Sequence, residues 1–187
     1  MTFPTDRQPP VTRVWIGCLS CYNSGFLVGE WYPAVDADEV TVYRLHQAVD
    51  APKFGCEELW VLDHENLPVK GELSTSEAAE WGRLIESVPA RERAAFLAYC
   101  QSPACDVGDD LPSVEAFRES YCGTWDSLRD YADHLAEDCA VFVDVPDHLI
   151  AFIDYESWAR QVGFDHVVVD VEDSLGLKTG QVYVFRL

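Results

Sequence analysis

An amphipathic stretch near the middle of the chain, residues 124–139, most constrains how the chain can fold. Its apolar residues recur at helical spacing and form one stripe: Leu128, Tyr131, Ala132, Leu135, Ala136 and Cys139. Its acidic residues follow at steps of four, three and four and align along another face: Asp126, Asp130, Asp133 and Glu137. Like charges at such spacings cost a helix about 0.2–0.5 kcal/mol per pair, and Arg129 offsets only part of this cost. We therefore expect a helix with an apolar inner stripe and an acidic outer face.

The acidic character extends well beyond this helix. Between Asp106 and Asp147 the sequence holds twelve acidic residues and two basic ones, Arg118 and Arg129. The net charge of the 187 residues is −20, yet 48% of them are hydrophobic, unlike a disordered acidic tail. A folded chain must carry this charge on its surface, which repels nucleic acid and favours basic grooves on other proteins. The simpler alternative is an acidic face that is merely solvated.

The first part of the chain is predicted to be a small α+β domain, residues 14–70, which follows a loose tail, residues 1–13. The expected elements are strand 14–22, a turn at Asn23-Ser24-Gly25, strand 26–32, helix 36–48 and strand 58–63. Turn residues between two apolar runs indicate that the first two strands form a hairpin.

A helical domain, residues 71–110, and a C-terminal α+β domain, residues 111–187, are predicted to follow. Ser74-Thr75-Ser76-Glu77 has the form of a capping box, which indicates a helix that begins there and ends near Glu86. The other expected elements are helices 89–100 and 113–119, the acidic helix, a helix from Pro146 to Gly163, and strands 166–171 and 181–186. The sequence thus predicts an α+β fold of three small domains.

The seven cysteines occur without a secretory signal or a long apolar run, which predicts a cytoplasmic protein with reduced thiols. Cys18 and Cys21 form a C-x-x-C pair, but a zinc site needs two further ligands. Only Cys100 and Cys105, or isolated histidines, could supply them. We therefore expect two thiols within a strand, and neither a metal nor another cofactor.

No residue pattern points to a catalytic site. The sequence has no glycine-rich phosphate loop, no G-x-S-x-G motif and no H-x-x-x-H spacing. Asp63 and Glu65 could hold a divalent cation, as could Asp109 with Asp110, but acidic pairs are expected by chance in a chain with 33 acids. A metal-dependent hydrolase that uses Asp63 and Glu65 stays open as an alternative, and we expect a protein that is not an enzyme.

Four blocks of sequence, in the same order, resemble the ArdA antirestriction family. The first is WIGCLSCYNSGFLVGEWYP, residues 15–33, in which Tyr22, Asn23, Gly25, Leu27, Gly29 and Trp31 carry the likeness. The others are EELWVLDHENLP (57–68), LRDYADHLAEDCAVFVDVPDHLIAFIDYESWARQV (128–162) and the terminal VYVFRL. Two positions depart from the family pattern: the C-x-x-C pair, and His64 in place of an aromatic residue.

The resemblance implies an elongated, three-part protein that dimerises through its C-terminal domain and imitates bent duplex DNA. Such a protein occupies the DNA-binding groove of a type I restriction-modification enzyme and protects an incoming mobile genetic element. We expect distributed acids to make that contact: Asp109, Asp110, Glu115, Glu119, Asp126, Asp130, Asp133, Glu137, Asp138, Asp144 and Asp147. An acidic module that binds another DNA-binding protein is the alternative partner assignment.

The net charge agrees with the size of a short DNA duplex. Duplex DNA carries one charge per about 1.7 Å, so a charge of −20 corresponds to about 34 Å, or about ten base pairs. Carboxylates along one helix face lie about 5–6 Å apart, which is sparser than the charges of DNA. Several elements must therefore contribute acids.

Overall fold

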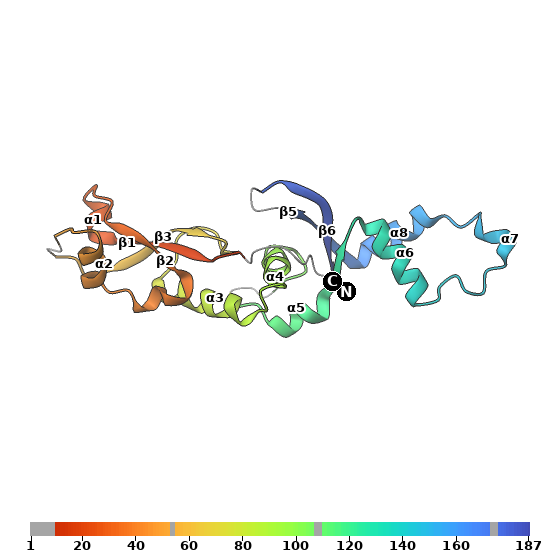
Figure 1. The fold of residues 1–187 in the computed structure, drawn as a ribbon, viewed down its shortest axis with the longest axis horizontal. Coiled ribbons are helices and arrows are strands. Elements are labelled where there is room, and N and C mark those ends of the chain that lie inside the picture. Colours follow the sequence, from red (N-terminus) through yellow and green to blue (C-terminus); the bar gives the residue numbers. More distant parts are fainter. Residues whose placement is uncertain (1–9, 53–54, 107–109, 173–175) are drawn as a thin grey trace. The chain divides into compact units, whose positions relative to one another are not determined.

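The computed structural model describes residues 10–52, 55–106, 110–172 and 176–187, so Asp109 lies outside the described residues. The described residues divide into two compact units, residues 10–97 and residues 98–187. Each unit combines helices with a three-stranded antiparallel sheet, which confirms the predicted α+β class (Figure 1). The three-domain division and the elongated shape stay predictions.

The N-terminal unit is built on a sheet with the strand order β2-β1-β3. These strands are β1 (Arg13–Cys18), β2 (Gly29–Pro33) and β3 (Leu59–Glu65), and β1 pairs with both neighbours in antiparallel register. Alternate side chains of the strands, Val14, Ile16 and Val61, are fully buried. One face of the sheet therefore provides the core of this unit, as the period of two in a half-buried strand requires.

The expected long hairpin is interrupted by a short helix, α1 (Leu19–Asn23). Strand β1 ends at Cys18, which is the N-cap residue of α1, and Cys21 lies within the helix. The prediction that the C-x-x-C pair lies inside a strand is therefore wrong. The chain still returns as β2, with Gly17 opposite Gly29.

Two glycines of this return, Gly25 and Gly29, have structural roles. Gly25 has a φ of 83°, in the left-handed region that favours glycine. A Cβ at Gly29 would lie 2.2 Å from the Trp15 ring, so only glycine allows that ring to pack here. Tyr22, from the same stretch of sequence, is 47% exposed and does not belong to the core.

Helices complete the N-terminal unit. They are the 3-10 helix η1 (Ala34–Glu39) and the α-helices α2 (Val42–Ala48) and α3 (Thr75–Ser87). The predicted helix 36–48 is thus divided in two, because Thr41 acts as the N-cap of α2 and accepts a hydrogen bond from the Arg44 amide. The predicted capping box is confirmed: Ser74 accepts from the Glu77 amide, and Glu77 accepts from the Ser74 amide. Helix α4 (Arg93–Cys100) follows and crosses the boundary between the units.

The C-terminal unit has a second sheet with the strand order β4-β6-β5. Its elements are α5 (Val114–Ser120), β4 (Tyr121–Trp125), α6 (Leu128–Asp138), α7 (Asp147–Ile150), α8 (Tyr155–Val162), the 3-10 helix η2 (Gly163–Asp165), β5 (His166–Glu172) and β6 (Lys178–Arg186). The predicted closing hairpin is confirmed, since β5 and β6 pair in antiparallel register. The hairpin gains β4 as a third strand, which the sequence had partly assigned to the acidic helix.

The predicted helix 146–163 is also divided. Asp154 ends the irregular segment after α7 and caps α8, because its carboxylate accepts hydrogen bonds from the amide and the hydroxyl of Ser157. These hydrogen bonds lower the pKa of Asp154. The sequence predicts Leu149, Phe152, Ile153 and Trp158 as the buried side of one helix, 146–163. Leu149 and Phe152 lie before the cap and are 45% and 81% exposed, so this prediction is wrong for them.

Candidate functional site

The acidic helix α6 is held by its apolar stripe against the C-terminal sheet. Tyr131, Ala132 and Ala136 are buried, and the first two share one core cluster with Ala159, Val162 and Val184. Helix α8 lies beside α6 (Figure 1), and the Trp158 indole N–H donates to the carbonyl of Ala132 at 2.7 Å. The Tyr131 hydroxyl contacts Nε2 of His166 at 3.0 Å. These contacts fix which face of α6 remains accessible.

The helix is shorter than predicted, which changes the place of two acidic residues. Ser127 is its N-cap and accepts a hydrogen bond from the Asp130 amide, so Asp126 precedes the helix and does not belong to the row along it. The Asp126 carboxylate instead accepts from the Gln181 side chain of β6 at 3.3 Å. Cys139, expected in the apolar stripe, is exposed.

The structure places the predicted acids mostly in solvent. Asp133 is half-buried, and the other described members of the set are exposed: Asp110, Glu115, Glu119, Asp126, Asp130, Glu137, Asp138, Asp144 and Asp147. Five of these extend from α6 to the first turn of α7, and we call them the α6–α7 carboxylates: Asp130, Glu137, Asp138, Asp144 and Asp147. Asp110, Glu115 and Glu119 lie in and before α5.

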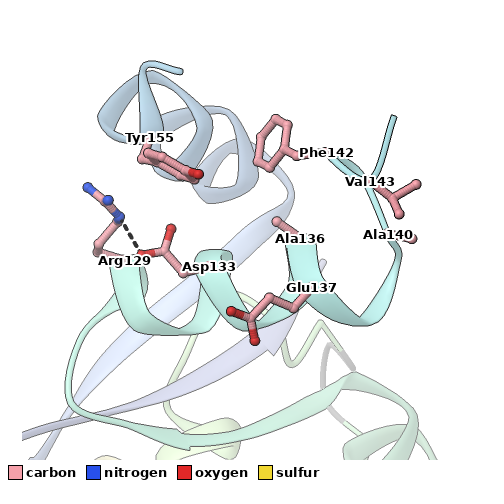
Figure 2. Close-up of a pocket in the computed structure, with 8 residues that line it drawn as sticks. All are labelled: Arg129, Asp133, Ala136, Glu137, Ala140, Phe142, Val143 and Tyr155. Atoms are coloured by element: carbon pink, nitrogen blue, oxygen red, sulfur yellow. Dashed lines mark hydrogen bonds and ion pairs between the residues drawn. The ribbon is translucent and has the colours of Figure 1, made fainter. Parts of the chain in front are cut away.

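Asp133 differs from its neighbours because Arg129 binds it. The Arg129 Nε donates to an Asp133 oxygen at 2.7 Å (Figure 2). A second nitrogen of the same guanidinium pairs with Glu156. The guanidinium carbon also lies 5.3 Å from the centre of the Tyr155 ring, a cation–π distance. The hydrogen bond to Asp133 raises the pKa of Arg129. Asp133 is therefore neutralised within the protein and offers less charge to a partner than the sequence suggested.

An open hollow of about 630 Å³ lies beside this cluster. Arg129, Asp133 and Glu137 of α6 and Tyr155 of α8 line it, together with Ala136, Ala140, Phe142 and Val143 (Figure 2). Phe142 packs edge-on against Tyr155, with the ring centres 5.6 Å apart. The hollow combines an aromatic wall with a paired cation.

A tryptophan of β4 lies against His134 of α6. The Trp125 ring stacks at an angle on the imidazole of His134, with the centres 4.9 Å apart. His134 Nε2 lies 3.2 Å from a carboxylate oxygen of Asp138, which forms an ion pair when the imidazole is protonated. Sequence reasoning did not find this contact, because Trp125 belongs to a strand that was predicted to be helical.

The hydrolase alternative gains little from the geometry. Asp63 and Glu65 are exposed on the same face of β3, and Glu65 faces Arg13 at 3.9 Å. Within the described residues, neither carboxylate gathers with two further Asp, Glu, His or Cys donors. In the same residues, no helix is both long enough and apolar enough to cross a bilayer.

The fold and the site define an acidic α+β protein that presents carboxylates on a helix packed against an antiparallel sheet. The sequence model of the antirestriction protein family ArdA matches residues 14–175, so the chain belongs to this family. The match confirms the family resemblance and covers three of the four sequence blocks, whereas the terminal block, residues 182–187, lies outside it. Family membership implies an antirestriction function and an interaction with restriction enzymes. A search of curated proteins returned no significant match to the chain.

Proposed function

We propose that this protein inhibits type I restriction-modification enzymes by occupying their DNA-binding groove as a mimic of duplex DNA. The observation that carries the proposal is the run of exposed α6–α7 carboxylates, of which Asp130, Glu137 and Asp138 lie on a helix fixed by buried contacts. A groove that binds phosphates offers many Lys and Arg side chains, and these would pair with carboxylates at several positions at once. The inhibition needs no catalytic step, and it would protect an incoming mobile genetic element inside the cytoplasm.

Two copies of the chain would act together in this proposal. One chain carries a net charge of −20, which corresponds to about ten base pairs of duplex, and a homodimer doubles that length to about twenty. A dimer formed through the C-terminal unit would present two copies of the α6–α7 carboxylates. Light scattering of the purified protein would give twice the mass of the chain if the dimer forms.

Competition with DNA tests the proposal directly. The protein is titrated into a type I restriction enzyme bound to labelled, unmethylated DNA, at a low and a high salt concentration. Release of the DNA at near-stoichiometric protein, and weaker release at high salt, is expected because both ligands would use the same basic groove. If a large excess of protein releases no DNA, the groove is not the target, and an affinity test with another DNA-binding protein becomes the relevant experiment.

Charge reversal locates the contact. We expect Glu137→Lys alone to weaken inhibition by about fivefold, because each reversed pair costs about 1 kcal/mol. The triple change of Glu137, Asp138 and Asp144 to lysine should weaken it by about 100-fold. The triple change should also flatten the salt dependence. Lysines at the C-terminal end of α6 suit the helix dipole, so the fold should tolerate them.

A matched variant separates position from net charge. Glu72, Glu80 and Glu86 are exposed residues of the N-terminal unit, and their change to lysine alters the net charge equally. This control should inhibit almost as well as the wild type. Equal loss in both triple variants would mean that net charge alone governs binding. Complete loss with Glu137→Lys in a folded protein would contradict distributed contact.

A further inference from the structure

Three thiols and one imidazole converge at one end of the N-terminal sheet. Cys18 ends β1, Cys21 lies in α1, His46 lies in α2, and Cys56 precedes β3. One ligand atom from each of the four side chains lies within 4.8 Å of all the others. Residues from three separate segments thus come together in a space the size of one metal coordination sphere.

The sulfur distances fit coordination to a metal. Cys21 Sγ and Cys56 Sγ are 3.6 Å apart, whereas a disulfide would place them about 2.05 Å apart. Two sulfurs that bind one zinc ion at about 2.3 Å, at tetrahedral angles, lie about 3.7 Å from each other. All seven cysteines of the chain are thiols in this structure. The observed spacing is therefore that of two ligands of one ion.

His46 is arranged as a metal-binding histidine usually is. Its side chain is buried, with 2% exposure, and its Nδ1 lies 3.3 Å from the carbonyl oxygen of Ala51. An Nδ1–H that donates to this carbonyl leaves the lone pair on Nε2, the tautomer that binds metal. Nε2 is buried and has no hydrogen-bond partner among the described residues. A buried, unpaired nitrogen is costly unless a ligand satisfies it.

The backbone holds the four ligands in place. The Cys18 amide donates to the Val28 carbonyl at 2.9 Å, and the Leu19 amide donates to the Glu58 carbonyl at 3.1 Å. The second of these bonds joins the start of α1 to the segment that carries Cys56. The Ala51 amide donates to the His46 carbonyl at 2.9 Å, which fixes the turn that positions the imidazole. The ligands thus sit on segments that the fold already connects.

We propose that Cys18, Cys21, His46 and Cys56 bind one zinc ion as a structural site. Three thiolates and one imidazole fill a tetrahedral sphere and leave no position for a substrate, and this donor set selects zinc over magnesium or calcium. A redox pair would use two of the thiols and would give no role to the third thiol and the buried imidazole of His46. The site lies in the unit that lacks the α6–α7 carboxylates, and the inference does not depend on the proposed antirestriction mechanism.

The metal content of the wild-type protein is the first test. The full chain is isolated without chelators or affinity tags that bind metal, and its metals are measured by mass spectrometry. One zinc ion per chain is expected. Exchange of zinc for Co²⁺ should give the ligand-field bands of tetrahedral cobalt and a thiolate-to-cobalt charge-transfer band. Removal of zinc with a chelator should lower the unfolding temperature, and added zinc should restore it.

Variants assign the ligands. Cys56→Ser should weaken zinc binding by more than about 100-fold, because loss of a partner outside the first coordination sphere already costs about 10–100-fold. Cys105→Ser is the matched control, since Cys105 is a half-buried thiol like Cys56 but lies outside the cluster, and it should keep its zinc. Circular dichroism of each variant shows whether it is folded.

Three results would overturn the proposal. A folded wild-type protein without zinc that gives no thiolate-to-cobalt band has no such site. A Cys21–Cys56 disulfide, found by peptide mapping of freshly isolated protein, would indicate a redox pair instead. Equal loss of zinc from Cys56→Ser and Cys105→Ser would place the ion elsewhere. None of these results bears on DNA competition, so the two proposals stand or fall separately.

Discussion

Arg129 shows how one residue can make a highly acidic helix compatible with a folded unit. Its guanidinium contacts Asp133, Glu156 and the Tyr155 ring together, so two carboxylates from different helices share one cation. One oxygen of Asp133, Oδ1, is buried and has no hydrogen-bond partner among the described residues. This carboxylate therefore depends on the ion pair that its other oxygen forms with Arg129.

Replacement of Arg129 tests this dependence. We expect Arg129→Ala to lower the free energy of unfolding, because it leaves a half-buried carboxylate unpaired beside a second one. Urea denaturation followed by circular dichroism measures the effect. Arg129→Lys should recover part of the loss, since lysine keeps the charge but not the forked geometry. If the stability of Arg129→Ala is unchanged, the ion pair of Arg129 with Asp133 contributes nothing measurable, as is common for ion pairs at a protein surface.

At the scale of elements, caps decide where the helices begin. Ser74, Thr41, Ser127 and Asp154 each accept a hydrogen bond from an amide in the first helical turn. In α3 the cap also involves Glu77, whose carboxylate accepts hydrogen bonds from the hydroxyl and the amide of Ser74. These bonds lower the pKa of Glu77. The charged form of Glu77 is therefore favoured by folding.

This shift sets the pH range in which Glu77 stabilises the protein. A carboxyl group with a lowered pKa adds stability above its unfolded pKa, near 4.5, and loses it as the pH falls through the folded value. We expect Glu77→Gln to be less stable than the wild type at pH 7, and the difference to shrink below pH 4.5. Thermal unfolding at a series of pH values measures it. A difference that stays constant down to strongly acidic pH would contradict the assignment.

The sequence predicted those elements whose signals are local. The capping box of α3 and the alternating strands of the closing hairpin are examples, and the structure confirms both. The sequence does not predict α1, because five residues are too few for a periodic pattern. It also predicts η1 and α2 as one helix across the Thr41 cap. Asp154 was likewise read as part of a helix that it in fact begins.

The candidate sites were predictable to different degrees. The acidic face of α6 was visible because its residues are close in sequence, although the pairing of Asp133 with Arg129 and Glu156 required the fold. The cluster around His46 joins distant segments, and two of its members, His46 and Cys56, belong to no recognisable spacing. Only the C-x-x-C pair signalled it, and no spacing in the sequence indicates that His46 and Cys56 lie beside that pair.

At the scale of the whole molecule, the net charge of −20 opposes compaction. We expect the unfolding temperature to rise as NaCl increases from about 0.01 M to about 0.15 M, because the screening length falls from about 30 Å to about 8 Å. Scanning calorimetry in NaCl measures this, since sulfate would also act by exclusion from the surface. The rise should be smaller in the triple lysine variant. An unfolding temperature that is independent of salt would show that the carboxylates are too far apart to repel.

The contact of Trp125 with His134 gives the protein an optical reporter of its own. Indole emission is sensitive to the charge of a neighbouring imidazole, and this imidazole also touches Asp138, one of the α6–α7 carboxylates. A basic partner that binds Asp138 would break its contact with the imidazole and so change the indole emission. No attached dye would be needed. Occupancy of the carboxylate row could then be followed in real time, as the difference in emission between the wild type and Trp125→Phe.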